Sequence, residues 1–193
     1  MEYKTYLINL ISGPGSGKSV LAAQIYVDLK TCEKKYVVEY VQEYAKKLVW
    51  SKDFETLNNQ YYVTTQQYKS LYQIVKKVEF IVTDGSILHG LYYNTLEDNT
   101  SNMEKTEKLI LDYYQKFNNI NIFLNRGDFE YEQQGRIQNE KEARQIDVIL
   151  KRMLDKNKIP YKEFKADVKN VDQMIKYIEE YVEKNSKDID KDI

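Results

Sequence analysis

Residues 6–19 read YLINLISGPGSGKS, and this stretch decides the fold. The apolar run Tyr6–Ile11 ends in a cluster of glycines, and residues 18–30 follow with apolar side chains at helical spacing. We therefore expect a buried strand, a tight loop and a helix in that order. This is the context of a P-loop, whose glycines let backbone N–H groups turn toward phosphate oxygens while the following helix adds its positive N-terminus.

The loop Ser12–Ser19 matches the P-loop pattern except at its first position, where serine stands in place of glycine. We expect Gly13 to take over the turn. Lys18, the first expected catalytic residue, then reaches the terminal phosphates, and the Ser19 hydroxyl helps to hold magnesium. The residues expected to contact the nucleotide are Gly13, Pro14, Gly15, Ser16, Gly17, Lys18, Ser19 and Val20. The alternative is a glycine-rich turn that binds no ligand.

The composition limits the class of protein. The chain has 193 residues, the size of one domain, with 29 Lys and Arg against 30 Asp and Glu and a net charge of -1. This balance argues against a protein that coats nucleic acid, because such domains are strongly basic. The single cysteine, Cys32, excludes an intramolecular disulfide and fits a reducing cytoplasm. We expect no signal peptide and no membrane segment, since no apolar run approaches about 18 residues.

Apolar strand patterns alternate with helical patterns along the chain. This alternation predicts an α/β fold of three layers, a P-loop NTPase sandwich with a five-stranded parallel sheet and helices on both faces. We expect a single domain over residues 1–185, followed by a charged, flexible tail at 186–193. The expected strands are 6–11, 36–41, 80–83, 120–124 and 159–164, and the expected helices are 18–30, 43–50, about 57–77, 86–94, 103–117, 140–157 and 168–184.

Two acidic residues follow predicted strands. Sites in parallel sheets lie at the carboxyl ends of the strands, so Glu43 and Asp84 are expected beside the P-loop. We assign Glu43 as the base that accepts the proton of an acceptor hydroxyl, and Asp84 as a magnesium or acceptor ligand. Glu39 competes for the base role. The alternatives are a solvated carboxylate at a helix N-terminus for Glu43 and a plain turn residue for Asp84.

Arginine is rare in this chain, and three of its four residues lie between positions 126 and 144, after the fourth strand. The polar segment at about 126–142 contains two glycines and predicts a short lid that closes over phosphates. We expect Arg126 and Arg136 to stabilise charge during phosphoryl transfer, and Arg144 to contact the nucleotide. The alternative is a solvated loop whose arginines pair with nearby glutamates. Arg152 is expected to be structural.

Weaker signals concern the adenine, the acceptor and the only histidine. Ala166 follows the fifth strand, where a small residue can contact the adenine base. Trp50 and several tyrosines can stack on an acceptor ring, although aromatic residues at helical spacing more often belong to the core. Because His89 is the only histidine, a histidine-dependent metal site is excluded, and we expect His89 to be structural.

The ordered motifs resemble a known family. Ser12–Ser19, Glu43-Tyr44-Ala45-Lys46, Thr83-Asp84-Gly85 and the segment from Asn125-Arg126 through Gly135-Arg136 to Ile146-Asp147 are similar to small P-loop proteins of the AAA-like ATPase family. These are related to the ribosylnicotinamide kinase domain of NadR, and many are carried by bacteriophages. The resemblance covers roughly residues 5–168 and implies that Glu43 meets the acceptor. Lys46 stands where the family often has arginine, and no arginine follows Asp84, unlike the Asp-Arg pair of deoxynucleoside kinases.

The leading hypothesis is an ATP- and Mg2+-dependent kinase that transfers the γ-phosphoryl group to a nucleoside-like hydroxyl, with nicotinamide riboside as first candidate. A (deoxy)nucleoside or nucleoside monophosphate kinase is the alternative within that class, and a kinase of polynucleotide ends is a further one. An ATP-binding regulatory protein with slow ATPase activity is the alternative from another class. A homodimer, a donor other than ATP and a nucleic-acid partner stay open.

Overall fold

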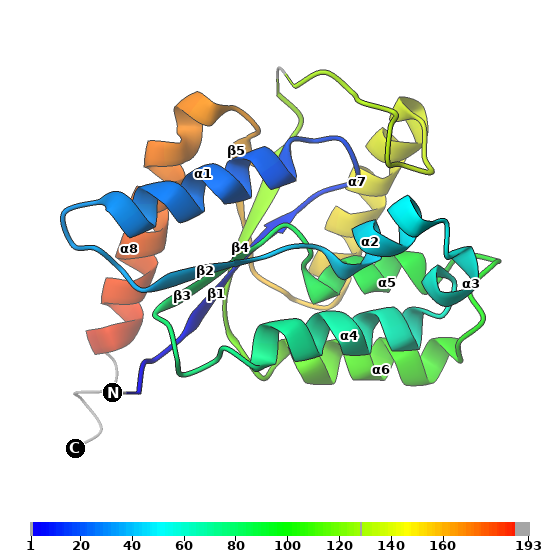
Figure 1. The fold of residues 1–193 in the computed structure, drawn as a ribbon, viewed down its shortest axis with the longest axis horizontal. Helices are drawn as coiled ribbons and strands as arrows, with labels where there is room; N and C mark the ends of the chain where they lie inside the picture. Colours follow the sequence, from blue (N-terminus) through cyan, green and yellow to red (C-terminus); the bar gives the residue numbers. More distant parts are fainter. Residues whose placement is uncertain (1, 128, 188–193) are drawn as a thin grey trace.

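The computed structural model describes residues 2–127 and 129–187. Its centre is a sheet of five strands in the order β2-β3-β1-β4-β5, in which every neighbouring pair is parallel (Figure 1). The strands are β1 Tyr6–Ile11, β2 Val38–Val41, β3 Phe80–Thr83, β4 Asn118–Asn125 and β5 Lys162–Lys165. The sequence-based prediction of a five-stranded parallel sheet is confirmed.

Helices cover both faces of the sheet. One face carries α1 (Lys18–Thr31) and α8 (Val171–Lys187), and the other carries α4 (Gln60–Tyr72), α5 (Gly90–Tyr93), α6 (Met103–Tyr114) and α7 (Glu140–Lys156) (Figure 1). The short helices α2 (Tyr44–Ser51) and α3 (Phe54–Leu57) and the 3-10 turns η1 (Ile87–His89) and η2 (Val168–Asn170) complete the chain. The three-layer architecture places the strand ends where loops can form a site.

The central strand β1 shows why the sequence adopts this arrangement. All six of its residues are buried. Because side chains alternate across a strand, Tyr6, Ile8 and Leu10 enter the core beneath α1 and α8, whereas Leu7 and Ile11 enter the core on the opposite face. Asn9, the polar exception, has its amide bonded to Asn119 and Asn121 of β4, 3.0 Å away in each case.

Several element ends differ from the prediction. The strand expected at 159–164 begins only at Lys162, because the Ile159 N–H donates to the Leu154 carbonyl and closes α7. The helix expected to reach Lys77 ends at Tyr72 and continues as turns. The last helix runs to Lys187, past the expected end of the domain at 185, and the rest of the expected tail, 188–193, lies outside the described residues.

The predicted lid is a segment without helix or strand between β4 and α7, as far as its residues are described, with position 128 outside the description. Its last three residues, 140–142, belong to the first turn of α7 instead. The Asn139 side chain accepts the Glu142 N–H and the Glu142 carboxylate accepts the Asn139 N–H, so a capping box starts this helix. We call residues 126–139 the arm.

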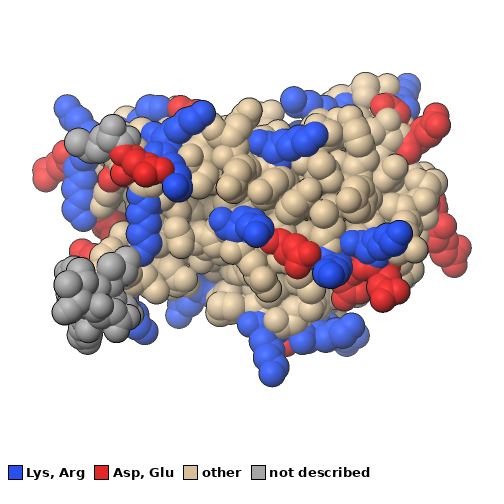
Figure 2. All heavy atoms as spheres, turned by 90° about the horizontal axis from the view of Figure 1, so that it is seen from below, with Lys and Arg blue, Asp and Glu red and all other residues tan. Residues whose placement is uncertain are grey.

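The surface carries charges of both signs. On the face shown in Figure 2, Lys and Arg are interspersed with Asp and Glu, without a continuous basic band. Within the described parts of the chain, no helix has both the length and the apolar character needed to span a membrane.

Candidate active site

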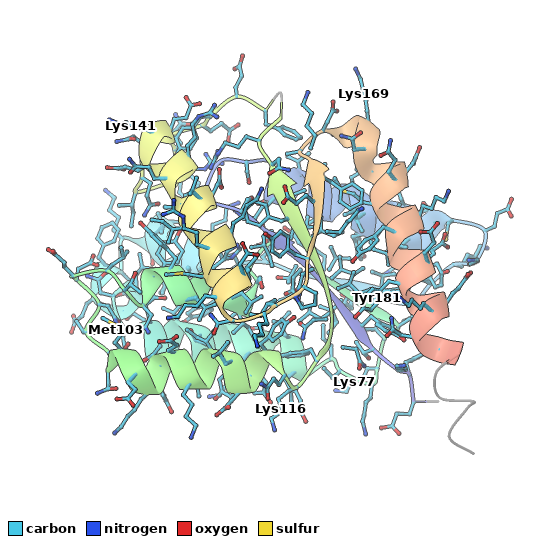
Figure 3. The ribbon with its side chains drawn as sticks, turned by 180° about the vertical axis from the view of Figure 1, so that it is seen from behind. Lys77, Met103, Lys116, Lys141, Lys169 and Tyr181 are labelled. Atoms are coloured by element: carbon cyan, nitrogen blue, oxygen red, sulfur yellow. The ribbon has the colours of Figure 1, made fainter. Side chains whose placement is uncertain are left out.

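The P-loop lies at the carboxyl end of the sheet, between β1 and α1. Figure 3 marks this end by Lys141 and Lys169, with Lys77 and Lys116 at the opposite end. Gly15 and Gly17 adopt left-handed backbone conformations with φ of 70° and 89°, which other residues avoid. No described side chain caps the N-terminus of α1, so its first N–H groups face the loop without an internal acceptor. This geometry suits an anionic ligand.

Lys18 is the buried cation of the loop. Its side-chain amine donates to the carbonyls of Ser12 at 2.9 Å and Gly13 at 2.8 Å. Burial lowers the pKa of Lys18, while the carboxylates of Glu43, Asp84 and Asp147 raise it. The ammonium is therefore held over the loop by groups that a phosphate chain can replace.

Asp84 joins the P-loop to the end of β2. One carboxylate oxygen accepts the Ser19 hydroxyl at 2.5 Å, and the other accepts the Glu43 N–H at 3.0 Å. These contacts follow from the topology, because β3 lies between β2 and β1 and all three strands end at the same edge. Gly85 makes the approach close, since an added Cβ would lie 2.5 Å from the Glu43 Cα. Ser19, Glu43 and Asp84 are thus brought together as the sequence predicted.

Glu43 supplies a carboxyl group at the end of β2, beside the P-loop. Its residue is half-buried directly before α2, and burial raises the pKa of its carboxyl above the ordinary value. Lys18 and Lys46 lower this pKa, and Asp84 raises it. Glu39, the competing candidate, is exposed on β2 and lies 4.0 Å from Lys30. The structure places Glu43, and not Glu39, beside the P-loop lysine.

Arg126 anchors the P-loop to α7. Its Nε donates to an Asp147 carboxylate oxygen at 2.6 Å, and an Nη donates to the Pro14 carbonyl at 2.8 Å. The other Asp147 oxygen accepts the Gly13 N–H at 2.6 Å. An added Cβ on Gly13 would lie 2.5 Å from the Ala143 carbonyl of α7, so only glycine permits this packing. In this structure Arg126, expected to be catalytic, holds the loop in place.

The Tyr131 ring lies between Arg136 and the P-loop. The Tyr131 ring packs against Gly15, and the Arg136 guanidinium lies 5.5 Å from the centre of that ring. Arg136 also donates to the Glu132 carbonyl. The Tyr131 hydroxyl donates to the Gln138 carbonyl at 2.5 Å, which orders the arm.

The remaining two predicted residues lie away from this centre. Arg144 is exposed on α7 and pairs with Glu140 at 2.7 Å, because its position on the helix faces solvent. Ala166 is fully buried after β5, and its N–H donates to the Asn125 carbonyl at 2.7 Å. Its carbonyl packs against Gly127 of the arm.

A cavity of about 490 Å³ connects the P-loop with Glu43 and Arg136. It extends from the P-loop past Glu43 to a chamber between α2, α4, α5 and the arm. Its polar and charged lining includes Lys18, Ser19, Glu43, Lys46, Asn58, Gln60, Thr64, Gln67, Ser86, His89, Tyr93, Asp98, Asn99, Glu132, Gln134, Arg136 and Gln138, whereas Arg126, Arg144 and Ala166 do not border it. Val20 borders the cavity and is half exposed.

Sequence reasoning missed two groups. Asp147 was only part of the family pattern, although its place after Ile146 on an amphipathic helix indicates a side chain near the core edge. Polar side chains of α4 such as Gln60 and Gln67 were lost in a Gln- and Tyr-rich run, yet they are buried and line the chamber. Their burial is known only from the folded chain, so the sequence alone gave no signal for them.

A family model described as "AAA domain" matches residues 7–170, which is most of the chain. The chain belongs to the AAA domain family. A search of curated protein sequences finds no match for this family member.

Solved structures share its fold. Deoxyadenosine kinase from M. mycoides with bound dATP is 17% identical, with a TM-score of 0.54 and coverage of 90% of this chain and 98% of that one. The YorR protein from Bacillus subtilis, in complex with phosphorylated GDP, is 16% identical, with a TM-score of 0.52 over 92% and 95%. Thymidylate kinase from Candida albicans is 17% identical, with a TM-score of 0.50 over 96% and 93%. The two named kinases are P-loop phosphotransferases, and at these identities the similarity shows that this AAA domain has their fold.

We predict that Asp147→Asn weakens both the fold and nucleotide binding. It leaves the largely buried Arg126 guanidinium without its carboxylate, so we expect a loss of about 1–3 kcal/mol, or roughly 3–10 °C in melting temperature. ATP affinity falls too, because the amide keeps one acceptor oxygen where the carboxylate used two, so Arg126 and the Gly13 N–H can no longer both be held as they are. Thermal melts and ATP titration measure these effects, with Glu180→Gln in the exposed pair with Lys176 as control. Wild-type melting and ATP affinity in Asp147→Asn would contradict the anchoring role.

We predict that Glu43→Gln raises the melting temperature at pH 7. Since the folded state raises the pKa of Glu43, its ionisation opposes folding once the pH exceeds the ordinary value of 4.5. Stability from the protonated acid is complete below that pH and is lost as the pH rises through the folded pKa. The gain from glutamine therefore shrinks toward pH 4. Melts of Glu43→Gln and of the exposed control Glu39→Gln across this range measure it, and a lower melting temperature for Glu43→Gln at pH 7 contradicts it.

Proposed function

We propose that this chain is an ATP-dependent kinase that transfers the γ-phosphoryl group to the hydroxyl of a small nucleoside-like acceptor. One observation carries the proposal: a single cavity is bordered both by the P-loop with Lys18 and by the half-buried carboxyl of Glu43. A nucleotide on the loop and an acceptor in the chamber then meet beside an acid whose raised pKa suits proton transfer. The family membership and the fold of the kinases support this function.

The chain's own residues would share the work of transfer. The P-loop N–H groups and Lys18 bind the phosphates, and Glu43 orients the acceptor hydroxyl and takes its proton. A bond forms between the acceptor oxygen and the γ-phosphorus, the bridge between the β- and γ-phosphates breaks, and ADP leaves. Arg136, which borders the same cavity, stabilises the charge on the transferring group. Positioning and electrostatics supply most of the rate in such reactions.

Ser19 and Asp84 fit a magnesium ion. The Ser19 hydroxyl and an Asp84 oxygen lie 2.5 Å apart, and oxygen ligands of this kind are those that Mg2+ prefers. Magnesium held by these two residues would supply positive charge that offsets the charge of the phosphates. Asp84 also holds the backbone of Glu43, so the same carboxylate would align the metal and the base.

Nicotinamide riboside is the first candidate acceptor, on the resemblance to the NadR kinase domain and its phage-borne relatives. The alternative within the class is a (deoxy)nucleoside or nucleoside monophosphate kinase. A specific observation favours a second candidate function, an ATP-binding regulator with slow hydrolysis. Arg126 pairs with Asp147, and Arg144 pairs with Glu140. Among the arginines of the described arm and α7, Arg136 is the one that borders the cavity, so it is the one placed to stabilise a transferring phosphoryl group.

We predict acceptor-dependent ADP release from Mg-ATP. The panel contains nicotinamide riboside, the ribo- and deoxynucleosides, their monophosphates and an oligonucleotide with a 5′-hydroxyl end. Release that accelerates with one acceptor class supports the kinase, whereas slow release that no acceptor changes supports the regulator.

We predict that Glu43→Gln lowers transfer by roughly 10²–10⁴-fold, because the acceptor loses its base, and leaves ATP affinity nearly unchanged. Lys18→Ala abolishes transfer and also weakens ATP binding strongly, since the loop loses its cation. Coupled-enzyme rates and ATP titration separate the two effects, with Glu39→Gln as the matched control. Full activity in Glu43→Gln removes that residue from the mechanism.

We predict that Arg136→Ala lowers turnover by about 10- to 1,000-fold and changes ATP affinity much less, because the guanidinium acts on charge that develops during transfer. Steady-state rates at saturating ATP and acceptor measure turnover, and Arg152→Ala on the exposed side of α7 is the control. Unchanged turnover in Arg136→Ala would show that the arm does not take part in the reaction.

A further inference from the structure

His89 is a buried polar side chain whose hydrogen bonds are unmet. It lies on η1, directly after the Asp84-Gly85-Ser86 turn, and is 6% exposed. Neither ring nitrogen makes a hydrogen bond of good geometry with a described residue, although the Ser12 backbone lies near enough to act on the ring. Buried polar groups almost always find partners, and a group left without one destabilises the folded protein. The sequence-based expectation of a purely structural histidine gives no reason for keeping this ring here.

The surroundings of His89 point to a ligand. The residue lines the cavity together with Thr64, Gly90 and Tyr93, on the side of the chamber that meets the P-loop. Burial and the Lys18 ammonium lower the pKa of His89 to about 3, with the Ser12 backbone acting in the opposite direction. The imidazole is therefore neutral at working pH, and it presents one N–H donor and one nitrogen acceptor.

Three polar side chains of the chamber already have partners. The Gln67 oxygen accepts the Tyr44 N–H at 2.7 Å, and the Gln60 amide donates to the Leu57 carbonyl at 2.7 Å. The Ser86 hydroxyl accepts the Leu88 N–H at 3.3 Å. These bonds fix the walls of the chamber, whereas the imidazole has only a weak interaction with the Ser12 backbone among the described residues.

We propose that His89 hydrogen-bonds the sugar hydroxyls of the acceptor, and that the acceptor is a nucleoside without a phosphate group rather than a nucleoside monophosphate. The inference rests on the proposed kinase function and specifies its substrate class. A hydroxyl both donates and accepts, so a sugar can satisfy both ring nitrogens, whereas phosphate oxygens at neutral pH chiefly accept.

The charges of the lining support an acceptor without a phosphate group. The cations Lys18, Lys46 and Arg136 are matched there by Glu43, Asp98 and Glu132. Lys18 is bound to the P-loop carbonyls and would turn to ATP, while Arg136 is engaged with Glu132. The remaining cation, Lys46, is exposed and already acts on the pKa of Glu43. A second phosphate dianion beside Glu43 would face repulsion with little cation to offset it.

The uniqueness of His89 permits a direct test. Because the sequence contains one histidine, selective 15N-histidine labelling of the full chain, with any affinity tag removed, reports on this ring alone. We expect the ring resonances to shift and one tautomer to become fixed when a nucleoside that serves as acceptor is added. Mg-ADP alone should cause a much smaller change. A ring signal that no acceptor moves overturns the contact.

Two variants separate binding from structure. His89→Leu removes both hydrogen-bonding groups at similar volume, so we expect a melting temperature higher by roughly 2–4 °C and an acceptor KM raised about tenfold or more, with the KM for ATP unchanged. His89→Asn keeps a donor and an acceptor and should recover part of the acceptor affinity. A structural histidine would give the reverse pattern, a less stable His89→Leu protein with wild-type acceptor KM.

The acceptor panel keeps the two hypotheses apart. If the wild-type protein phosphorylates no acceptor, the proposed kinase function fails. If it phosphorylates an acceptor but the His89 signal and the acceptor KM of His89→Leu do not change, only the present inference fails. A monophosphate used with higher kcat/KM than its nucleoside overturns the assignment of the substrate class.

Discussion

The ammonium of Lys18 is the constraint on which the site depends. A positive charge buried to this degree is stable only when oxygen atoms surround it, and here the Ser12 and Gly13 carbonyls bind it directly. Carboxylates from the ends of β2 and β3 and from α7 add their field. These acids lie far apart in the sequence, so the lysine is satisfied only once the parallel sheet and α7 are assembled.

Close packing that only glycine permits holds this assembly together. Gly13 lets the loop approach α7 so that Asp147 can accept a loop N–H, and Gly85 lets the end of β3 approach Glu43. Asp147 and Arg126 bind the loop at Gly13 and Pro14. The left-handed turns at Gly15 and Gly17 follow these two residues in the chain. The loop is thereby fixed in shape before any nucleotide arrives, which lowers the entropy lost on binding.

Local sequence predicted what depends on local geometry. The strand before the P-loop, the order of strands and helices, and the meeting of Glu43 with Asp84 follow from periodicity and from the rule that parallel strands end at one edge. The Arg126–Asp147 contact depends on how α7 is rotated against the loop, which no local pattern reports. No local sequence pattern indicates the role of His89, because the lack of good hydrogen-bond partners for its ring arises only in the folded chamber. The Ile159 N–H closes α7 because its hydrogen bond to the Leu154 carbonyl outweighs the strand propensity of this residue.

The pKa of the Lys18 amine is lowered and the pKa of the Glu43 carboxyl is raised, and the two groups act on each other. Binding of ATP would therefore change the pKa of Glu43. In the structure, Lys18 lowers the pKa of the Glu43 carboxyl, and Glu43 in turn favours the charged lysine. A phosphate chain on the loop would neutralise the lysine's field and add negative charge nearby, and both changes raise the proton affinity of Glu43. The carboxylate would thus become a stronger base when ATP is bound. Exclusion of water by the arm would strengthen the same coupling, because charges interact over a longer range in a dry cavity.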